Sequence, residues 1–194
     1  MARPREFSIE ETLDKAIHVF WSKGYEGASV NDLTATMGLS KSSFYDTFGS
    51  KRELFLSTLD HYAKTPAARR AASLIAAADS PKDGIAAAFA YFIDNLLSGR
   101  EIRGCYANSS AAEITAPDPE VAKRVMAAFG QLEQALFNAV VDGQLIGQIS
   151  RSQEPVKLAR FLCASINGLI VLGKTAPPRE ALEGIVQVAL SVLD

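Results

Sequence analysis

The amino-acid sequence predicts an all-α protein, and three observations support this prediction. Apolar residues recur at three- and four-residue spacing along almost the whole chain, which is typical of helices with one buried face. Segments repeatedly begin at a serine or a proline and end near a glycine, as helices do. Alternating patterns of β-branched residues, which would indicate strands, are nearly absent.

Short helices are predicted to follow one another at the N-terminus, each opened by a serine. Ser8 and Glu11 form a capping box, in which each side chain satisfies a backbone N–H group at the helix start. Gly24 and Gly38 follow apolar-periodic segments and are predicted to end them, because glycine readily adopts left-handed conformations. We expect helices over about residues 9–23, 30–37, 41–46 and 51–65.

The rest of the chain is predicted to form a second, larger helical unit. Prolines mark several of its helix starts, since proline fits the first helical position. We expect helices over about residues 67–78, 81–97, 104–115, 120–142, 155–174 and 178–193. The predicted domains are residues 1–50 and residues 51–194.

The composition is that of a globular protein and argues against several classes. The 194 residues, 48% hydrophobic and 22% charged, are enough to bury a core. A net charge of −2 argues against a general nucleic-acid coat, although a local basic face is compatible with DNA binding. Two cysteines are too few for a secreted disulfide framework. No signal peptide or clean membrane span is seen, so we expect a cytoplasmic protein with no membrane partner.

Residues 30–48 carry the pattern of a helix-turn-helix, two short helices joined by a tight glycine turn. Gly38 permits the sharp turn between them. In such motifs the first turn of the second helix contacts base edges, and here it carries Lys41, Ser42 and Ser43. The sequence therefore predicts a unit that binds double-stranded DNA.

Further polar side chains around this motif are candidates for DNA contact. Ser29 and Ser40 precede the two helices as N-caps, where free N–H groups favour phosphate. Lys51 and Arg52 open the following helix within reach of phosphate, and Arg5 belongs to a short basic arm. The predicted DNA-binding residues are Arg5, Ser29, Ser40, Lys41, Ser42, Ser43, Tyr45 and Lys51.

The stretch from residue 12 to residue 55 resembles the signature of the TetR family of transcriptional regulators. The matching residues are Phe20, Gly24, Tyr25, Ser29, Asp32, Leu33, Gly38, Leu39, Ser40, Lys41, Phe44, Tyr45, Phe48, Ser50, Lys51 and Leu54. The resemblance implies that Tyr45 and Lys51 contact phosphates, and that the second domain forms a dimer and holds an inducer pocket. Ser43 stands where the family commonly has glycine, a departure that bears on base preference. Trp21 and Phe44 are interpreted as core residues.

The last two predicted helices carry apolar stripes that suit a homodimer interface. Their small residues would let partner helices approach closely and pack as a four-helix interface. The predicted interface residues are Phe161, Leu162, Ser165, Leu169, Leu172, Leu182, Ile185, Val186 and Ala189. The alternative is that these stripes only fill the core of one chain.

An apolar pocket with a few polar groups is expected in the second domain, and it would suit a small organic effector. The candidate ligand and sensor residues are Phe89, Phe92, Cys105, Tyr106, Asn108, Glu113 and Phe129. The alternative for each of them is a place in the core.

The segment from residue 103 to residue 114 is similar to an Arg-Gly-Cys element of a TetR subgroup. That subgroup includes repressors that respond to electrophiles through a cysteine, and Cys105 takes the matching place. A helix start and the neighbouring Arg103 would favour the thiolate form. The sensor hypothesis competes with an inert packing cysteine, which is also the interpretation of Cys163.

An enzyme is the main rival class, but the supporting patterns are absent from the sequence. No glycine-rich phosphate loop or metal-ligand spacing is present, and His18 and His61 are isolated. We therefore expect no catalysis, no cofactor and no metal. The predicted function is a ligand- or redox-responsive repressor that binds a palindromic operator as a dimer. The alternative is an architectural or protein-interaction factor with the same motif and no small-molecule inducer.

Overall fold

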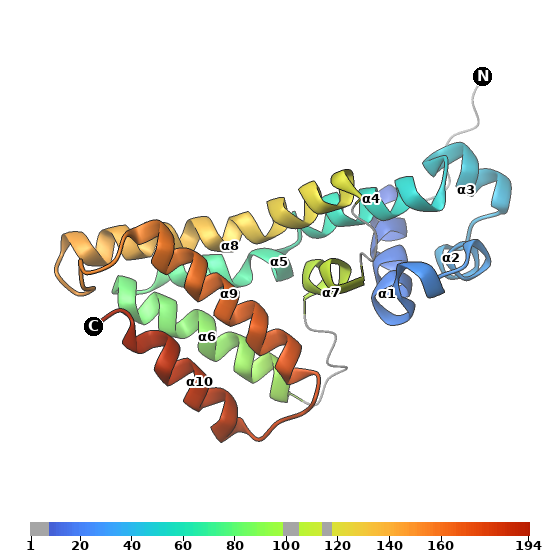
Figure 1. The fold of residues 1–194 in the computed structure, drawn as a ribbon. Coiled ribbons are helices and arrows are strands. Elements are labelled where there is room, and N and C mark those ends of the chain that lie inside the picture. Colours follow the sequence, from blue (N-terminus) through green and yellow to red (C-terminus); the bar gives the residue numbers. More distant parts are fainter. Residues whose placement is uncertain (1–7, 99–104, 114–117) are drawn as a thin grey trace.

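The computed structural model describes residues 8–98, 105–113 and 118–194, and the regular structure of these residues is entirely helical (Figure 1). The helices are α1 (Ile9–Gly27), α2 (Val30–Met37), α3 (Lys41–Phe48), α4 (Lys51–Tyr62), α5 (Pro66–Ala77), α6 (Pro81–Leu97), α7 (Tyr106–Glu113), α8 (Pro119–Leu145), α9 (Pro155–Gly173) and α10 (Arg179–Ser191). The all-α prediction is confirmed.

The N-terminal helices form a small bundle whose caps are those expected from the sequence. The Ser29 side chain accepts a hydrogen bond from the N–H group of Asp32, and the Asp32 carboxylate completes the capping box. Gly38 has φ 72° and ψ 31°, the left-handed conformation that ends α2. Gly24, expected to end α1, instead makes a kink with φ 73° inside it. Fully buried Leu33 and Phe44 lie in the core of this bundle.

The second core is built from the longer helices. α8 packs against α5, α6 and α9, and α10 packs against α6 and α9. Figure 1 shows α1, α2 and α3 at one end of the molecule, α6, α9 and α10 at the other, and α7 between them. The predicted domain boundary at residue 50 lies in the turn before α4, and α4 packs against both α1 and α8.

α9 is, among the described residues, the one helix long and apolar enough to cross a membrane by length and composition. It packs against α6, α8 and α10, and 44% of its most apolar 18-residue stretch is buried. α9 is therefore a central helix of the second core, with an apolar face left over.

Gly84 on α6 allows α5 and α6 to lie in close contact. A Cβ atom there would stand 2.6 Å from the carbonyl oxygen of Ile75, a backbone atom that cannot turn aside. We expect Gly84→Ala to destabilise the protein by about 1–3 kcal/mol. Gly130→Ala is the matched control, since a Cβ there meets nothing within 4 Å. It should stabilise α8 by roughly 0.5–1 kcal/mol. Urea unfolding of both variants tests this, and equal stabilities would contradict it.

Candidate DNA-binding surface and ligand cavity

The first turn of α3 is presented to solvent. Lys41 and Ser42 are exposed, and Ser43 is half-buried. Ser40 caps the helix by accepting a hydrogen bond from the N–H group of Ser43 at 3.1 Å. The Ser40 hydroxyl also lies 2.9 Å from the hydroxyls of Ser42 and Ser43. These serines thus form a small hydroxyl cluster at the N-terminus of α3, beside the exposed Lys41.

Ser29 is held in a comparable way at the start of α2. Its hydroxyl donates to the Asp32 carboxylate at 2.7 Å, and the pair is anchored by Lys23. The hydrogen bonds from Lys23 and Ser29 lower the pKa of Asp32 well below its ordinary value. The side chain of Ser29 therefore caps α2, and Ser29 is exposed to solvent. Arg5, also predicted to bind DNA, lies outside the described residues.

Two further predicted DNA-binding residues follow the first turn of α3: Tyr45 lies on α3 itself, and Lys51 is the first residue of α4. The Tyr45 side chain is 49% exposed and stands edge-on to buried Phe44 at 5.1 Å between ring centroids. The Lys51 ammonium lies 4.4 Å from the centroid of the Tyr25 ring, a cation–π contact. The sequence pattern included Tyr25 but did not indicate this contact. The cation–π contact holds the Lys51 side chain at the N-terminus of α4. Free backbone N–H groups at a helix N-terminus favour the binding of phosphate.

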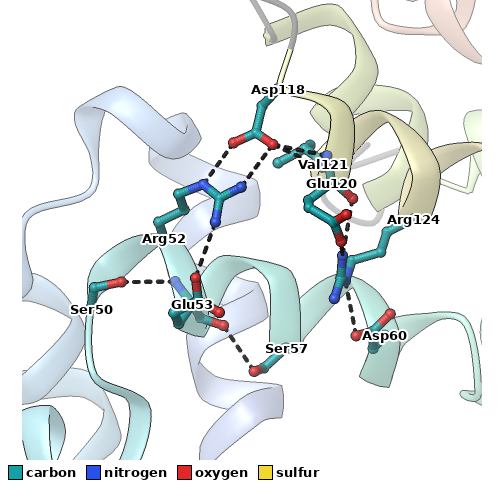
Figure 2. A network of polar contacts seen from close by, with 9 residues as sticks. All are labelled: Ser50, Arg52, Glu53, Ser57, Asp60, Asp118, Glu120, Val121 and Arg124. Carbon is teal, nitrogen blue, oxygen red and sulfur yellow. Dashed lines mark hydrogen bonds and ion pairs between the residues drawn. The ribbon is translucent and has the colours of Figure 1, made fainter.

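Arg52 has a different place from the phosphate contact expected for it. Its Nε and Nη2 atoms donate to the two carboxylate oxygens of Asp118 at 2.7 and 2.9 Å, and Nη1 donates to Glu53 (Figure 2). The guanidinium lowers the pKa of Asp118 to about 2. Asp118 is also the N-cap of α8, accepting from the N–H groups of Glu120 and Val121. Arg52 therefore ties the start of α4 to the start of α8.

A second ion pair joins the same two helices. Arg124 on α8 donates to Asp60 on α4 at 3.0 Å and to Glu120 within its own helix at 2.6 Å (Figure 2). Two arginines, one from each helix, thus hold α4 along α8.

Glu113 also joins the two parts of the molecule. Its carboxylate accepts a hydrogen bond from the backbone N–H group of Tyr25 at 2.9 Å. An added Cβ at Gly24 would lie 2.9 Å from the same carboxylate, so the α1 kink fits closely around it. The structure therefore places Glu113 at the C-terminal end of α7 against α1, and not at the cavity predicted for it.

A cavity of about 340 Å³, partly open to solvent, lies where α1, α4, α5, α6, α7, α8 and α9 meet. Its lining residues are Trp21, Tyr62, Ala67, Ala68, Ala71, Tyr91, Phe92, Asn95, Leu96, Ser98, Cys105, Ala107, Ala128, Phe129, Leu132, Asn167 and Ile170. Three of the predicted ligand residues, Phe92, Cys105 and Phe129, come together here.

The other predicted ligand residues lie around this cavity. Phe89 is fully buried in the second core. Tyr106 is buried in the N-terminal core, and its hydroxyl lies 2.8 Å from that of Thr58. Asn108 donates to the side-chain oxygen of Asn167 at 3.0 Å and so supports one cavity wall from behind. Sequence reasoning missed Trp21 as a lining residue because its apolar spacing on α1 indicated only a core position.

The two cysteines occupy different surroundings. Cys105 is half-buried at the cavity wall, and its Sγ atom accepts a hydrogen bond from the Tyr62 hydroxyl at 3.6 Å. Burial, reinforced by Cys105, raises the pKa of Tyr62. Cys163 is buried in the second core, and burial raises the pKa of its thiol to about 11. Arg103, expected to stand beside Cys105, lies outside the described residues.

The predicted dimer residues divide into two groups. Leu162, Leu169, Leu182 and Ala189 are buried within the chain, because α9 packs one face against α6 and α8, and α10 packs one face against α6 and α9. Ser165 and Val186 are half-buried.

The second group faces solvent on α9 and α10. The exposed apolar side chains there are Phe161 (45%), Val171 (51%), Leu172 (46%), Ile185 (39%) and Val188 (68%). Val188 was not predicted as an interface residue, although the i, i+3 spacing from Ile185 indicates the same face. α9 and α10 thus leave several large apolar side chains exposed.

Comparison with known proteins gives the same fold over the whole chain. Residues 13–58 match the family model described as bacterial regulatory proteins of the tetR family, and residues 81–188 match the tetracyclin repressor-like C-terminal domain. The chain is 34% identical over 197 residues to the uncharacterized HTH-type transcriptional regulator YezE of Bacillus subtilis, covering 100% of both chains. It is 28% identical to the HTH-type transcriptional repressor ComR of Escherichia coli, covering 98% of this chain and 90% of ComR.

A solved structure extends the comparison to a DNA complex. A cysteine mutant of the regulator CifR, complexed with a 26-base-pair operator DNA, matches 99% of this chain and 100% of its own. The TM-score is 0.83 and the sequence identity is 30%.

Proposed function

The chain belongs to the TetR family of bacterial regulatory proteins, and we propose that it is an effector-responsive repressor that binds a palindromic operator as a homodimer. The observation that carries this proposal is the exposed first turn of α3 beside Lys51 and Tyr45. The relative ComR, which is a transcriptional repressor, supports the assignment as a repressor. The CifR complex with operator DNA supports the proposed binding to an operator. The proposal includes a cytoplasmic location and no catalytic activity, as expected for such a regulator.

The proposed DNA contacts fall into two kinds. Lys41, Ser42 and Ser43 stand at the exposed N-terminus of α3, where side chains reach base edges in helix-turn-helix proteins. Tyr45 and Lys51 lie beside them and bind phosphates, which sets the register on the duplex without reading sequence. Ser29 and Ser40 contribute mainly by capping α2 and α3.

Lys51→Ala is expected to weaken binding to all DNA sequences by a similar factor. One lost phosphate contact should reduce the slope of log affinity against log salt concentration by about one unit. Lys157→Ala is the matched control, because Lys157 lies on α9 and pairs with Glu154. Fluorescence anisotropy of labelled operator over a range of salt concentrations measures the slope. A slope unchanged in Lys51→Ala would remove the phosphate role of this lysine.

The proposed dimer surface is the uncovered apolar face of α9 and α10. Gly168 lies between Phe161 and Leu172 on α9, and Gly184 lies four residues before Val188 on α10; an added Cβ at either glycine would meet nothing within 4 Å in the same chain. Small residues between large apolar ones allow two helices to approach closely. A two-fold pairing here would present two α3 helices to successive turns of one DNA face, roughly 34 Å apart.

Cys105 is the proposed sensor residue for electrophiles. It stands at the cavity wall just before α7, whose other end holds Tyr25 through Glu113. The Cys105 sulfur adds to the carbon–carbon double bond of N-ethylmaleimide. A carbon–sulfur bond forms, the double bond becomes a single bond, and the thiol proton is transferred to the neighbouring ring carbon. The bulk of the adduct would displace α7, and with it the kink of α1 and the Tyr25–Lys51 contact.

DNase footprinting on the DNA upstream of the gene, with and without N-ethylmaleimide, tests these assignments together. We expect one palindromic protected region, which N-ethylmaleimide erases for the wild-type protein but not for Cys105→Ser. Many dispersed protected sites would favour the architectural alternative. Equal sensitivity of the wild-type protein and Cys105→Ser would refute the sensor role and leave the repressor assignment in place.

A further inference from the structure

Two carboxylates, one at the end of α7 and one at the start of α8, contact residues that neighbour Lys51. Glu113 is the last residue of α7, and Asp118, five positions later, is the N-cap of α8. Glu113 accepts a hydrogen bond from the backbone N–H group of Tyr25, and Asp118 accepts two from the guanidinium of Arg52. Tyr25 contacts Lys51 through its ring, and Arg52 follows Lys51 on α4. Both contacts therefore converge on the same lysine.

The contact with Glu113 fixes the place of the Tyr25 ring. Tyr25 directly follows the α1 kink at Gly24, and its N–H group donates to the Glu113 carboxylate at 2.9 Å. The Tyr25 ring packs against Phe55, with 4.8 Å between the ring centroids. The Lys51 ammonium lies 4.4 Å from the centroid of the Tyr25 ring. The carboxylate thus sets where the ring stands, and the ring sets where the ammonium stands.

The contact with Asp118 fixes the start of α4. Figure 2 shows the Arg52 guanidinium between the carboxylates of Asp118 and Glu53, with all three of its nitrogen atoms donating. A bidentate pair holds the planar guanidinium in one orientation. The hydrogen bonds from Arg52 lower the pKa of Asp118 to about 2, so this carboxylate is ionised at neutral pH. Arg52 is therefore committed to carboxylates of the protein, while Lys51 carries the proposed phosphate contact.

We infer that Glu113 and Asp118 are positioning residues for operator binding. Acting through their partners Tyr25 and Arg52, they hold Lys51 where it meets a phosphate. The inference rests on the proposed function and adds two residues that act without touching DNA. A lysine that is already oriented loses less side-chain freedom on binding, so its phosphate contact is stronger.

The sign of the expected effect separates positioning from simple electrostatics. Glu113 and Asp118 are acidic and DNA is a polyanion, so electrostatics alone predicts that removing either charge strengthens DNA binding. Positioning predicts that the same change weakens DNA binding, because the Lys51 ammonium is no longer held in place.

Asp118→Asn tests the ion pair without removing the helix cap. Asparagine caps a helix about as well as aspartate, so the start of α8 is kept. A partly exposed ion pair contributes little to folding, so the urea unfolding midpoint should stay close to that of the wild type. We expect operator affinity to fall about three- to tenfold. Fluorescence anisotropy of a labelled duplex carrying the footprinted region measures this, and an affinity at or above the wild-type value would overturn the role of Asp118.

Asp60→Asn is the matched control. It also removes one carboxylate from an ion pair between α4 and α8, the pair with Arg124. Asp60 lies nine positions after Lys51, about 13 Å further along α4. Operator affinity should therefore stay close to the wild-type value. A loss equal to that of Asp118→Asn would mean that α4 only needs attachment to α8, and it would contradict the positioning of Lys51.

Two substitutions of Glu113 separate its hydrogen bond from its charge. Glu113→Gln keeps an oxygen that can accept from the Tyr25 N–H group, whereas Glu113→Ala removes it. Both substitutions remove the same negative charge. We expect the alanine variant to lose operator affinity and the glutamine variant to retain most of it. Equal affinities of the two variants would overturn the role of Glu113.

The Lys51→Ala background shows whether both carboxylates act through this lysine. Without the ammonium there is nothing to position, so Asp118→Asn and Glu113→Ala should cause no further loss of affinity. Losses that add to that of Lys51→Ala would contradict the inference. A wild-type protein that protects no DNA region would contradict the proposed repressor. Normal wild-type binding with additive losses would contradict only the positioning by the two carboxylates.

Discussion

Val188→Glu is expected to dissociate the proposed homodimer and to reduce operator affinity by about a hundredfold or more. Val188 is 68% exposed in the single chain, so glutamate there should leave the fold of the protomer intact. In a dimer the same side chain would be surrounded by Phe161, Leu172 and Ile185 and their counterparts. Burying an unpaired carboxylate in such an interface costs several kcal/mol.

The effect on DNA binding follows from the loss of the second half-site. In the proposed binding mode, a protomer on its own would place one α3 helix in one major groove, and the binding energy of the other half-site would be lost. Gln187→Glu is the matched control, because it adds the same negative charge to the same helix at a position that lines the groove between α6 and α10. Sedimentation velocity and operator anisotropy measure both properties. A Val188→Glu protein that stays dimeric and binds normally would place the interface elsewhere.

Phe44→Ala is expected to destabilise the N-terminal bundle by about 3–5 kcal/mol. Phe44 is 0% exposed, lies in the first core with Leu33 and Leu54, and is the one buried side chain of α3. Removing the ring leaves a cavity that short helices cannot close. The helix-turn-helix should then unfold, and specific DNA binding should disappear with it.

Tyr45→Ala is the matched comparison at the next position of the same helix. Tyr45 is 49% exposed, so its removal should change the stability little while weakening binding to all DNA sequences. Urea unfolding followed by circular dichroism, together with operator anisotropy, separates the two effects. Equal stability losses in the two variants would contradict the division between a structural and a DNA-contacting aromatic residue.

The sequence by itself determined the features that depend on neighbouring residues. Capping by Ser29 and Ser40 and the turn at Gly38 act over three or four residues, so they were predicted correctly. The exposed first turn of α3 followed from the same signals. The end of α1 was predicted at Gly24 but lies beyond it, since contacts of the kink with Glu113 were not visible in a local pattern.

Only the tertiary structure decided the roles of residues whose partners are distant in sequence. Arg52 pairs with Asp118, 66 positions away, and Glu113 with Tyr25, 88 positions away. An apolar stripe shows that a helix face is buried but not what covers it, so Leu162 and Phe161 looked alike until packing separated them. The position of Trp21 at the cavity wall could not be predicted from the sequence for the same reason. Helical periodicity reports which side of a helix avoids water, whereas the facing atoms are fixed only when the whole chain has folded.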